Sequence, residues 1–214
     1  MNHKTLKRKL KLRQTEFGEI HTIRIHRAIS WLKAAEENEN TLDLKFICLW
    51  ISCNSLYAID NIQFEKMKER ERFADFVDRL VELDIENRLY NALWNKFSQP
   101  IRLLVDNQFV YEPYWNYVRG DIFEWEKGFK KQQKDAYIAL SEKNVGFLFR
   151  IILDRLYALR NQLIHGGSTF KSKVNRFQVK DGISILSFVL PIMIDIMLDN
   201  PQENWGMIYY PPVS

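Results

Sequence analysis

The chain has 214 residues, of which 46% are hydrophobic and 27% are charged, and its formal net charge is +4. This composition is typical of one globular domain with a sizeable core, and it excludes a low-complexity chain or two large domains. With 8 glycines and 6 prolines, the sequence also disfavours an architecture of strands and turns.

The first 15 residues form a basic arm. Six lysines and arginines precede the first acidic residue, Glu16, and the remainder of the chain therefore carries a net charge of −2. Positive charge gathered in one place favours a directed contact with a polyanion over general adhesion. We expect this arm to be either a polyanion-contacting tail or a disordered tail that aids solubility, and disorder is the favoured interpretation.

Residues 16–200 are expected to form a single helical domain, followed by a C-terminal tail over 201–214. Apolar residues recur at spacings of three and four, which predicts amphipathic helices and an all-α fold. The repeating sets are Ile25, Ala28, Leu32 and Ala35; Phe46, Leu49, Cys53 and Leu56; and Phe73, Phe76, Leu80 and Leu83. The polar residues 38–41 are expected to connect the first two of these helices.

The cysteines and the most apolar run of the sequence indicate the cellular location of the protein. Cys48 and Cys53 lie five residues apart with no histidine nearby, which fits no metal pattern and suits a reducing compartment. The apolar run over 183–198 is broken by Pro191 and Asp195 and is shorter than the roughly 20 residues of a membrane span. We expect a cytoplasmic protein without a metal, a cofactor or a membrane partner.

The middle of the chain differs from its flanks in having an expected helix break and a segment rich in aromatic residues. Pro100 predicts a break in the helical pattern, because proline disfavours helix at the preceding residue. An aromatic segment then runs from Phe109 to Trp125. It could stack bases, but the favoured interpretation is that it packs an irregular insertion onto the core, because aromatic side chains carry large buried areas.

The clearest predicted helix ends at Gly166-Gly167, since glycine commonly follows the last turn of a helix. Its apolar stripe is Phe149, Ile152, Leu156, Leu159 and Leu163; at about 100° per residue, Arg150, Asp154, Tyr157, Asn161 and His165 share a neighbouring face. Asn161 and His165 are four residues apart and can touch. Arg160 falls on the border between the two faces.

Basic side chains follow this helix end. Lys171, Lys173 and Arg176 come shortly after it, and no acidic residue lies between Asp154 and Asp181. Arginine offers a planar fork of donors to a phosphodiester, and histidine can take and give a proton near neutral pH. The stretch therefore indicates a phosphate-handling site.

A structural interpretation of the same residues also stands. A histidine in the last turn favours the helix dipole when it is charged. An arginine at the edge of an apolar stripe often covers that stripe with its stem. The residues alone leave both interpretations open.

The chain resembles HEPN proteins (higher eukaryotes and prokaryotes nucleotide-binding), in particular the larger stand-alone bacterial type. The resemblance lies in residues 159–167, Leu-Arg-Asn-Gln-Leu-Ile-His-Gly-Gly, which are similar to the family's Arg-polar-x-x-x-His signature. Residues 168–182 and the apolar helix at 46–57 support it. It covers about 20–60 and 145–200, and the segment at about 60–145 looks like a helical insertion.

The resemblance implies a dimeric helical bundle that acts as a metal-independent endoribonuclease. His165 would be the general base or acid, Arg160 would hold the scissile phosphate, and Asn161 would orient His165 or the substrate. The expected products are a 2′,3′-cyclic phosphate and a 5′-hydroxyl. Lys171, Lys173 and Arg176 would contact the RNA backbone, although a solvated loop explains them equally well.

Three functions follow from these expectations. The first is a ribonuclease of a toxin–antitoxin or anti-phage defence system, with RNA as its substrate and an antitoxin or regulatory chain as a further partner. The second is a non-catalytic RNA- or nucleotide-binding module. The third is a dimeric interaction scaffold. The pair of Arg160 and His165 favours the first.

Overall fold

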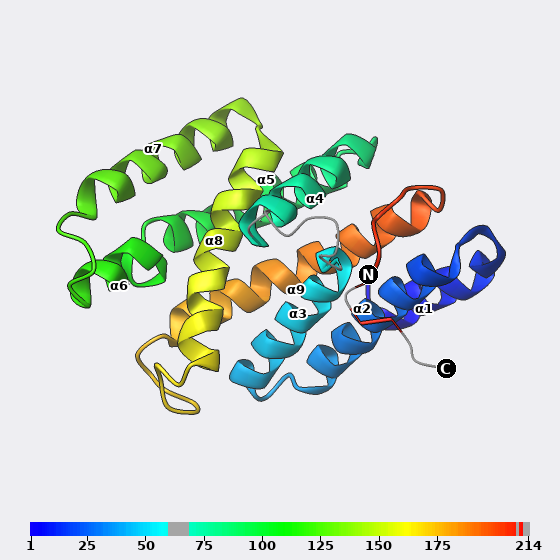
Figure 1. Cartoon of the computed structure of the whole chain (residues 1–214), viewed down its shortest axis with the longest axis horizontal. Coiled ribbons are helices and arrows are strands. Elements are labelled where there is room, and N and C mark those ends of the chain that lie inside the picture. The colour runs from blue at the N-terminus through cyan, green and yellow to red at the C-terminus, as the bar shows by residue number, and fades with distance from the viewer. Residues whose placement is uncertain (60–68, 209, 212–214) are drawn as a thin grey trace.

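The computed structural model describes residues 1–59, 69–208 and 210–211, without the side chains of 69, 70 and 95–97. These residues fold into helices, and their one isolated β-bridge joins Ile59 to Ile208, so the predicted all-α class is confirmed (Figure 1). The α-helices are α1 (His3–Leu12), α2 (Glu19–Glu37), α3 (Leu42–Tyr57), α4 (Glu69–Leu83), α5 (Arg88–Val105), α6 (Glu112–Val118), α7 (Glu126–Glu142), α8 (Val145–Ile164) and α9 (Arg176–Asp199). Two short 3₁₀ helices, η1 (Gln14–Glu16) and η2 (Gln108–Val110), complete them.

Helix α9 is the centre of the fold. It runs through the middle of the molecule, with α3 and α5 packed along it and with α1, α2, α4 and α8 also in contact (Figure 1). It is the one helix, among the residues described, that is long and apolar enough to cross a membrane, and 72% of its most apolar window is buried inside the fold. It begins at Arg176 and continues through Pro191.

The basic N-terminal arm is a packed helix, which corrects the expectation of a disordered tail. Leu6 and Leu10, one helical turn apart, are 0% and 6% exposed, and α1 contacts both α2 and α9. The expectation of disorder rested on the cations of the arm, and an apolar stripe of only two leucines is easily overlooked among them. Burial of the two leucines against the core supplies the stability that a ten-residue helix lacks alone.

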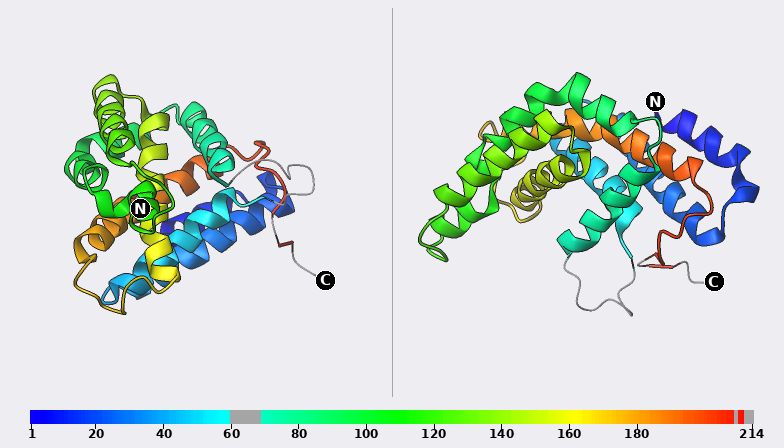
Figure 2. Two further views of the ribbon diagram at one scale, coloured as in Figure 1. Left: turned by 60° about the vertical axis from the view of Figure 1, so that its left-hand side comes forward. Right: turned by 90° about the horizontal axis from the view of Figure 1, so that it is seen from above.

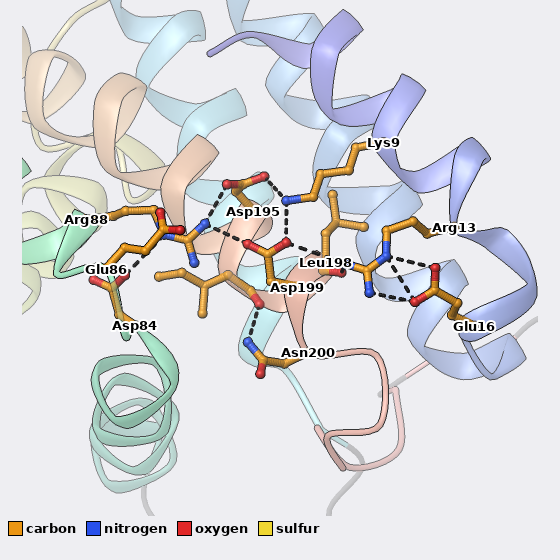
Figure 3. A network of polar contacts seen from close by, with 11 residues as sticks. Lys9, Arg13, Glu16, Asp84, Glu86, Arg88, Asp195, Leu198, Asp199 and Asn200 are labelled. Carbon is orange, nitrogen blue, oxygen red and sulfur yellow. Dashed lines mark hydrogen bonds and ion pairs between the residues drawn. The ribbon is translucent and has the colours of Figure 1, made fainter.

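A network of ion pairs joins α1, α5 and α9 (Figure 3). Asp195 of α9 accepts from Lys9 Nζ at 2.5 Å and from Arg88 Nη1 at 2.7 Å. Asp199, one turn later, pairs with the same two cations at 2.6 and 2.7 Å. Because α1, α5 and α9 each contribute, the network fixes how these three helices meet.

A buried arginine joins α2, α3 and the C-terminal tail. Arg24 is 0% exposed and donates to the carbonyl oxygens of Leu56, Ala58 and Gly206 at 2.8–3.0 Å. Burial, with a smaller contribution from the charge of Arg27, lowers the pKa of its guanidinium to about 10. The described residues of the predicted tail are therefore attached to the core.

The middle segment belongs to the same core. Helices α4 and α5 bury apolar side chains in the cluster that α3, α8 and α9 form, and α5 continues through Pro100, so the predicted break there is wrong. Ile101 and Leu104, just after the proline, are 0% and 1% exposed. Their burial offsets the roughly 3 kcal/mol that proline costs inside a helix. Residues 60–68 of the predicted insertion lie outside the described chain.

The aromatic segment lies against α8 through η2, and α7 packs on α8 directly. Its aromatic side chains are half-buried or exposed, with Phe123 99% exposed, so the segment is less buried than the favoured interpretation expected. Arg155 of α8 is 1% exposed, and its guanidinium carbon lies 4.6 Å from the ring centroid of Tyr111 and 5.2 Å from that of Phe129. Burial lowers the pKa of Arg155 to about 10. This packing places α6 and α7 at one end of the molecule, with α1 at the other (Figures 1 and 2).

Candidate functional site

The candidate site lies where α8 ends. The helix stops at Ile164, His165 is its C-cap residue, and Gly166 takes the left-handed conformation with φ +70°. The amide of Gly167 then donates back to the carbonyl oxygen of Gln162 at 2.8 Å. This arrangement is a Schellman-type C-cap, and it confirms that Gly166-Gly167 terminates the helix.

Arg160 is half-buried and held on two sides. Its Nη1 donates to Asn161 Oδ1 at 2.8 Å, and its guanidinium carbon lies 5.8 Å from the centroid of the Tyr157 ring. Its Nε atom is buried and has no hydrogen-bond partner among the described residues. The amide and the ring therefore restrict the guanidinium.

His165 is exposed at the helix end. Its backbone amide donates to the carbonyl oxygen of Asn161 at 3.0 Å, but within the described chain its imidazole has no hydrogen-bond partner. Asn161 thus contacts Arg160 through its side chain and His165 only through the backbone. In this structure the amide orients the arginine, not the histidine.

A pocket of about 160 Å³ with aromatic residues in its wall lies beside this face of α8. It lies between α3, α4 and α8, and its wall includes Trp50, Phe73 and Tyr157. The Trp50 and Tyr157 rings meet edge to face with centroids 6.0 Å apart. Because Tyr157 also lies under Arg160, the pocket links the position of the guanidinium to the packing of α3.

The loop between α8 and α9 is tied to the start of α3, beside which it lies (Figures 1 and 2). Asp43 Oδ2 accepts from the backbone amide of Lys171 at 2.8 Å. The same carboxylate accepts from Arg176 Nη1 at 3.0 Å and Nη2 at 3.3 Å. The Asp43 side chain is 10% exposed and that of Arg176 is 20% exposed.

This clamp corrects one expectation about the site. The local sequence is free of acids, but the fold brings a carboxylate from 128 residues away to the loop. Arg176 is engaged with Asp43 and with the carbonyl oxygen of Ser172, so its side chain holds the loop instead of facing a ligand. Lys171 and Lys173 are exposed.

Exposed apolar side chains surround the same helix end. Ile164 ends α8 and is 49% exposed. Phe170 and Val174 of the loop are 63% and 88% exposed, and Phe177, in the first turn of α9, is 78% exposed. We call these four residues the apolar rim. Contiguous exposed apolar surface is typical of interaction sites, and the sequence analysis missed these four residues because they lie between basic ones.

The remaining histidines and the cysteines lie elsewhere. His21 is 8% exposed and stacks on Phe17 with ring centroids 4.9 Å apart, so it is a packing residue. Burial, with the nearby charge of Arg24, lowers its pKa to about 4. Cys53 is a buried free thiol whose pKa burial raises to about 12. Within the described ranges, no group of three or more His, Cys, Asp or Glu side chains could hold a metal ion.

The arrangement offers one guanidinium and one imidazole at the same helix end. The guanidinium can bind a phosphate and stabilise negative charge on its oxygens. The imidazole can accept or donate one proton at a time. Comparison with family models, with curated proteins and with solved structures finds no match for the chain.

Proposed function

We propose that this protein is a metal-independent endoribonuclease of the HEPN type that acts as a homodimer in the cytoplasm. One observation carries the proposal. Arg160, restrained by Asn161 and Tyr157, and His165, with its imidazole exposed, lie within two turns of one another at the end of α8. That pairing is the minimum for holding a phosphodiester and moving a proton beside it.

In the proposed reaction, His165 accepts the proton of a ribose 2′-hydroxyl. The 2′-oxygen forms a bond to the adjacent phosphorus, and the bond from phosphorus to the 5′-oxygen breaks. Arg160 stabilises the negative charge that develops on the non-bridging oxygens. The leaving oxygen takes up a proton, and the products are a 2′,3′-cyclic phosphate and a 5′-hydroxyl.

The second proton transfer supports a dimer. Each chain brings one histidine to this helix end, and the imidazole of a second copy would protonate the leaving 5′-oxygen while the first takes the 2′-proton. The apolar rim gives that second copy a surface to cover, since Val174 and Phe177 are more than three-quarters exposed. Lys171 and Lys173 would then contact the RNA backbone beside the shared site.

The test is cleavage of a labelled single-stranded RNA in the presence of a chelator. We expect His165→Ala to lower the rate by about 10²–10⁴-fold, the usual contribution of a general acid or base. Arg160→Ala should lower it by about 10²–10³-fold, as for a lost oxyanion donor. Lys134→Ala, which removes an exposed cation from α7, is the control and should cleave normally.

A substrate control tests the mechanism separately from the enzyme. An RNA with one 2′-deoxynucleotide should resist cleavage at that linkage and at no other. Cleavage that survives both His165→Ala and Arg160→Ala would eliminate the proposed site. Cleavage with undiminished specific activity at concentrations where the protein is monomeric would eliminate the shared mechanism.

Two other outcomes decide between the alternatives. If the protein binds RNA with a salt-dependent affinity but never cuts it, the binding module is correct. If it forms a stable dimer and neither binds nor cuts RNA, the interaction scaffold is correct. A role in a toxin–antitoxin or anti-phage system, with a regulatory partner chain, is part of the first proposal.

A further inference from the structure

Helix α1 separates its cations into two groups. Lys9 and Arg13 turn toward α9, where Lys9 Nζ lies 2.5 and 2.6 Å from carboxylate oxygens of two aspartates and Arg13 Nη1 lies 2.6 Å from the carbonyl oxygen of Leu198 (Figure 3). A second group occupies another face of the helix. It consists of Lys4, Lys7, Arg8 and Lys11, which we call the α1 cations. All four are exposed, and none has an ion-pair partner among the described residues.

The α1 cations line a groove. Their spacings of three, four and seven residues place them on one face of the helix, within an arc of about 100°. That face and α2 border an open groove of about 620 Å³, to which α2 contributes His26, Ser30 and Lys33. No carboxylate belongs to its lining. Two of the lining residues pair with acids outside the lining, His3 with Glu36 and Lys33 with Glu37 at 3.4 Å.

This arrangement is unfavourable for the helix by itself. Like charges three and four residues apart repel one another, and Lys4 lies in the first turn, where the helix dipole disfavours a cation. The first turn of α1 contains no acid to compensate. A bound anion would reduce this repulsion.

The shape of the groove selects the kind of anion. Lys4 and Lys11 are separated by about 10 Å along the helix axis, at 1.5 Å per residue, which is longer than one phosphate group. The apolar residue of the lining, Ile29, is 4% exposed and offers nothing to the interior of a lipid bilayer. A lining of several cations with one buried apolar residue suits consecutive phosphates of one chain, although Leu12 and Trp31 beside it are 73% and 40% exposed.

We propose that the groove between α1 and α2 binds the sugar-phosphate backbone of a nucleic acid. The groove offers charged donors but neither a tyrosine nor a tryptophan for stacking a base, so the contacts give affinity without reading sequence. This inference goes beyond the proposed ribonuclease, because it concerns other residues on other helices. The groove can bind RNA even if the end of α8 does no chemistry, and the reverse also holds.

The experiment measures affinity against salt concentration with two fluorescein-labelled probes, a short oligouridylate and an oligothymidylate, which has no 2′-hydroxyl to cleave. The variant replaces all four α1 cations by glutamine. Each phosphate contact to a single strand contributes about 0.7 to the slope of log affinity against log salt. The slope should therefore fall by about 3, and binding at 0.1 M salt should weaken roughly 600-fold for both probes, the effect of that slope over the decade of salt below 1 M.

A matched variant controls for net charge. Helix α7 carries four exposed lysines, Lys127, Lys130, Lys131 and Lys134, and it lies at the end of the molecule away from α1 (Figures 1 and 2). Replacing these four by glutamine changes the charge by the same amount and should leave the slope unchanged. An equal loss of slope in both variants would show general attraction and overturn the proposal.

Two further measurements keep the result decisive. Replacing only Lys7 and Lys11 by glutamine disturbs the helix less and should lower the slope by about 1.5. Replacing the three lysines by arginine keeps the charge and should keep the slope. Unchanged nucleic-acid binding in the glutamine variants would refute the proposal. If these variants instead lose only their binding to vesicles that contain phosphatidylserine, the groove is a membrane-binding face. His165→Ala should not affect either probe's binding to the groove.

Discussion

Substitution of Asp43 by asparagine should release the loop that follows His165. The carboxylate accepts the backbone amide of Lys171 and both terminal nitrogens of Arg176. Asparagine keeps the shape and one acceptor oxygen, so it can still hold the Lys171 amide. It removes the negative charge and leaves the guanidinium of Arg176, 20% exposed, without a counter-ion.

The cost follows from burial. Removing one partner of a fully buried ion pair costs about 3–5 kcal/mol, because the other charge stays desolvated. A hydrogen bond to a charged group contributes about 1.5–3 kcal/mol. Since one-fifth of the Arg176 side chain still reaches water, we expect Asp43→Asn to lower the free energy of unfolding by about 2–3 kcal/mol.

Urea unfolding of four proteins measures this effect. The set is the unmodified chain, Asp43→Asn, Arg176→Met and the double variant, and the coupling energy between the two positions should be about 2 kcal/mol. Asp121→Asn is the matched control, since that carboxylate pairs with Arg119 at 3.0 Å while both side chains are 59% exposed. An exposed pair of this kind contributes less than about 1 kcal/mol.

The result that refutes the reasoning is additivity. If the double variant loses the sum of the two single losses, Asp43 and Arg176 do not act as a pair and the loop is held by other contacts. If the coupling is found, RNA cleavage should also decrease in Asp43→Asn, because the side chain of Arg176 no longer pairs with a charge on α3 to hold the loop after His165. Undiminished cleavage would separate the clamp from the proposed site.

Three further perturbations test the fold. Burial holds the folded pKa of His21 near 4, below the ordinary 6.5, so the full stability of the protein is present above pH 6.5, where the ring is neutral in both the folded and the unfolded state. The free energy of unfolding should decrease by about 3 kcal/mol as the pH falls from 6.5 to 4. His21→Phe should abolish this pH dependence in thermal melts. Gly182→Ala would place a Cβ 2.9 Å from the buried ring of Phe46 and should destabilise by about 1–3 kcal/mol in urea; an unchanged midpoint would show that α3 and α9 can separate. Asp195→Asn leaves Arg88 with one fewer partner and should cost about 2 kcal/mol, a loss that persists in 1 M salt because the Asp195 side chain is 10% exposed; a loss that disappears in salt would place the interaction at the surface.

The sequence determined the local structure of this protein. Apolar side chains at spacings of three and four gave the helices, and the polar residues 38–41 gave the connector between α2 and α3. Gly166 ended α8, because a left-handed residue interrupts the helix wherever it occurs. The sequence also placed Arg160, Asn161 and His165 at one helix end, because all three lie on a single helix and its cap, which fixes their spacing.

Only the tertiary structure decided what lies around those residues. The carboxylate of Asp43 reaches the loop from 133 residues before Arg176, and no local pattern announces such a contact. Leu6 and Leu10 make the basic arm a helix because α2 and α9 give them a surface on which to be buried. Helix α5 continues through Pro100 because the burial of Ile101 offsets what proline costs locally. Helical period and capping act between neighbours in the chain, whereas burial and charge pairing act between neighbours in space.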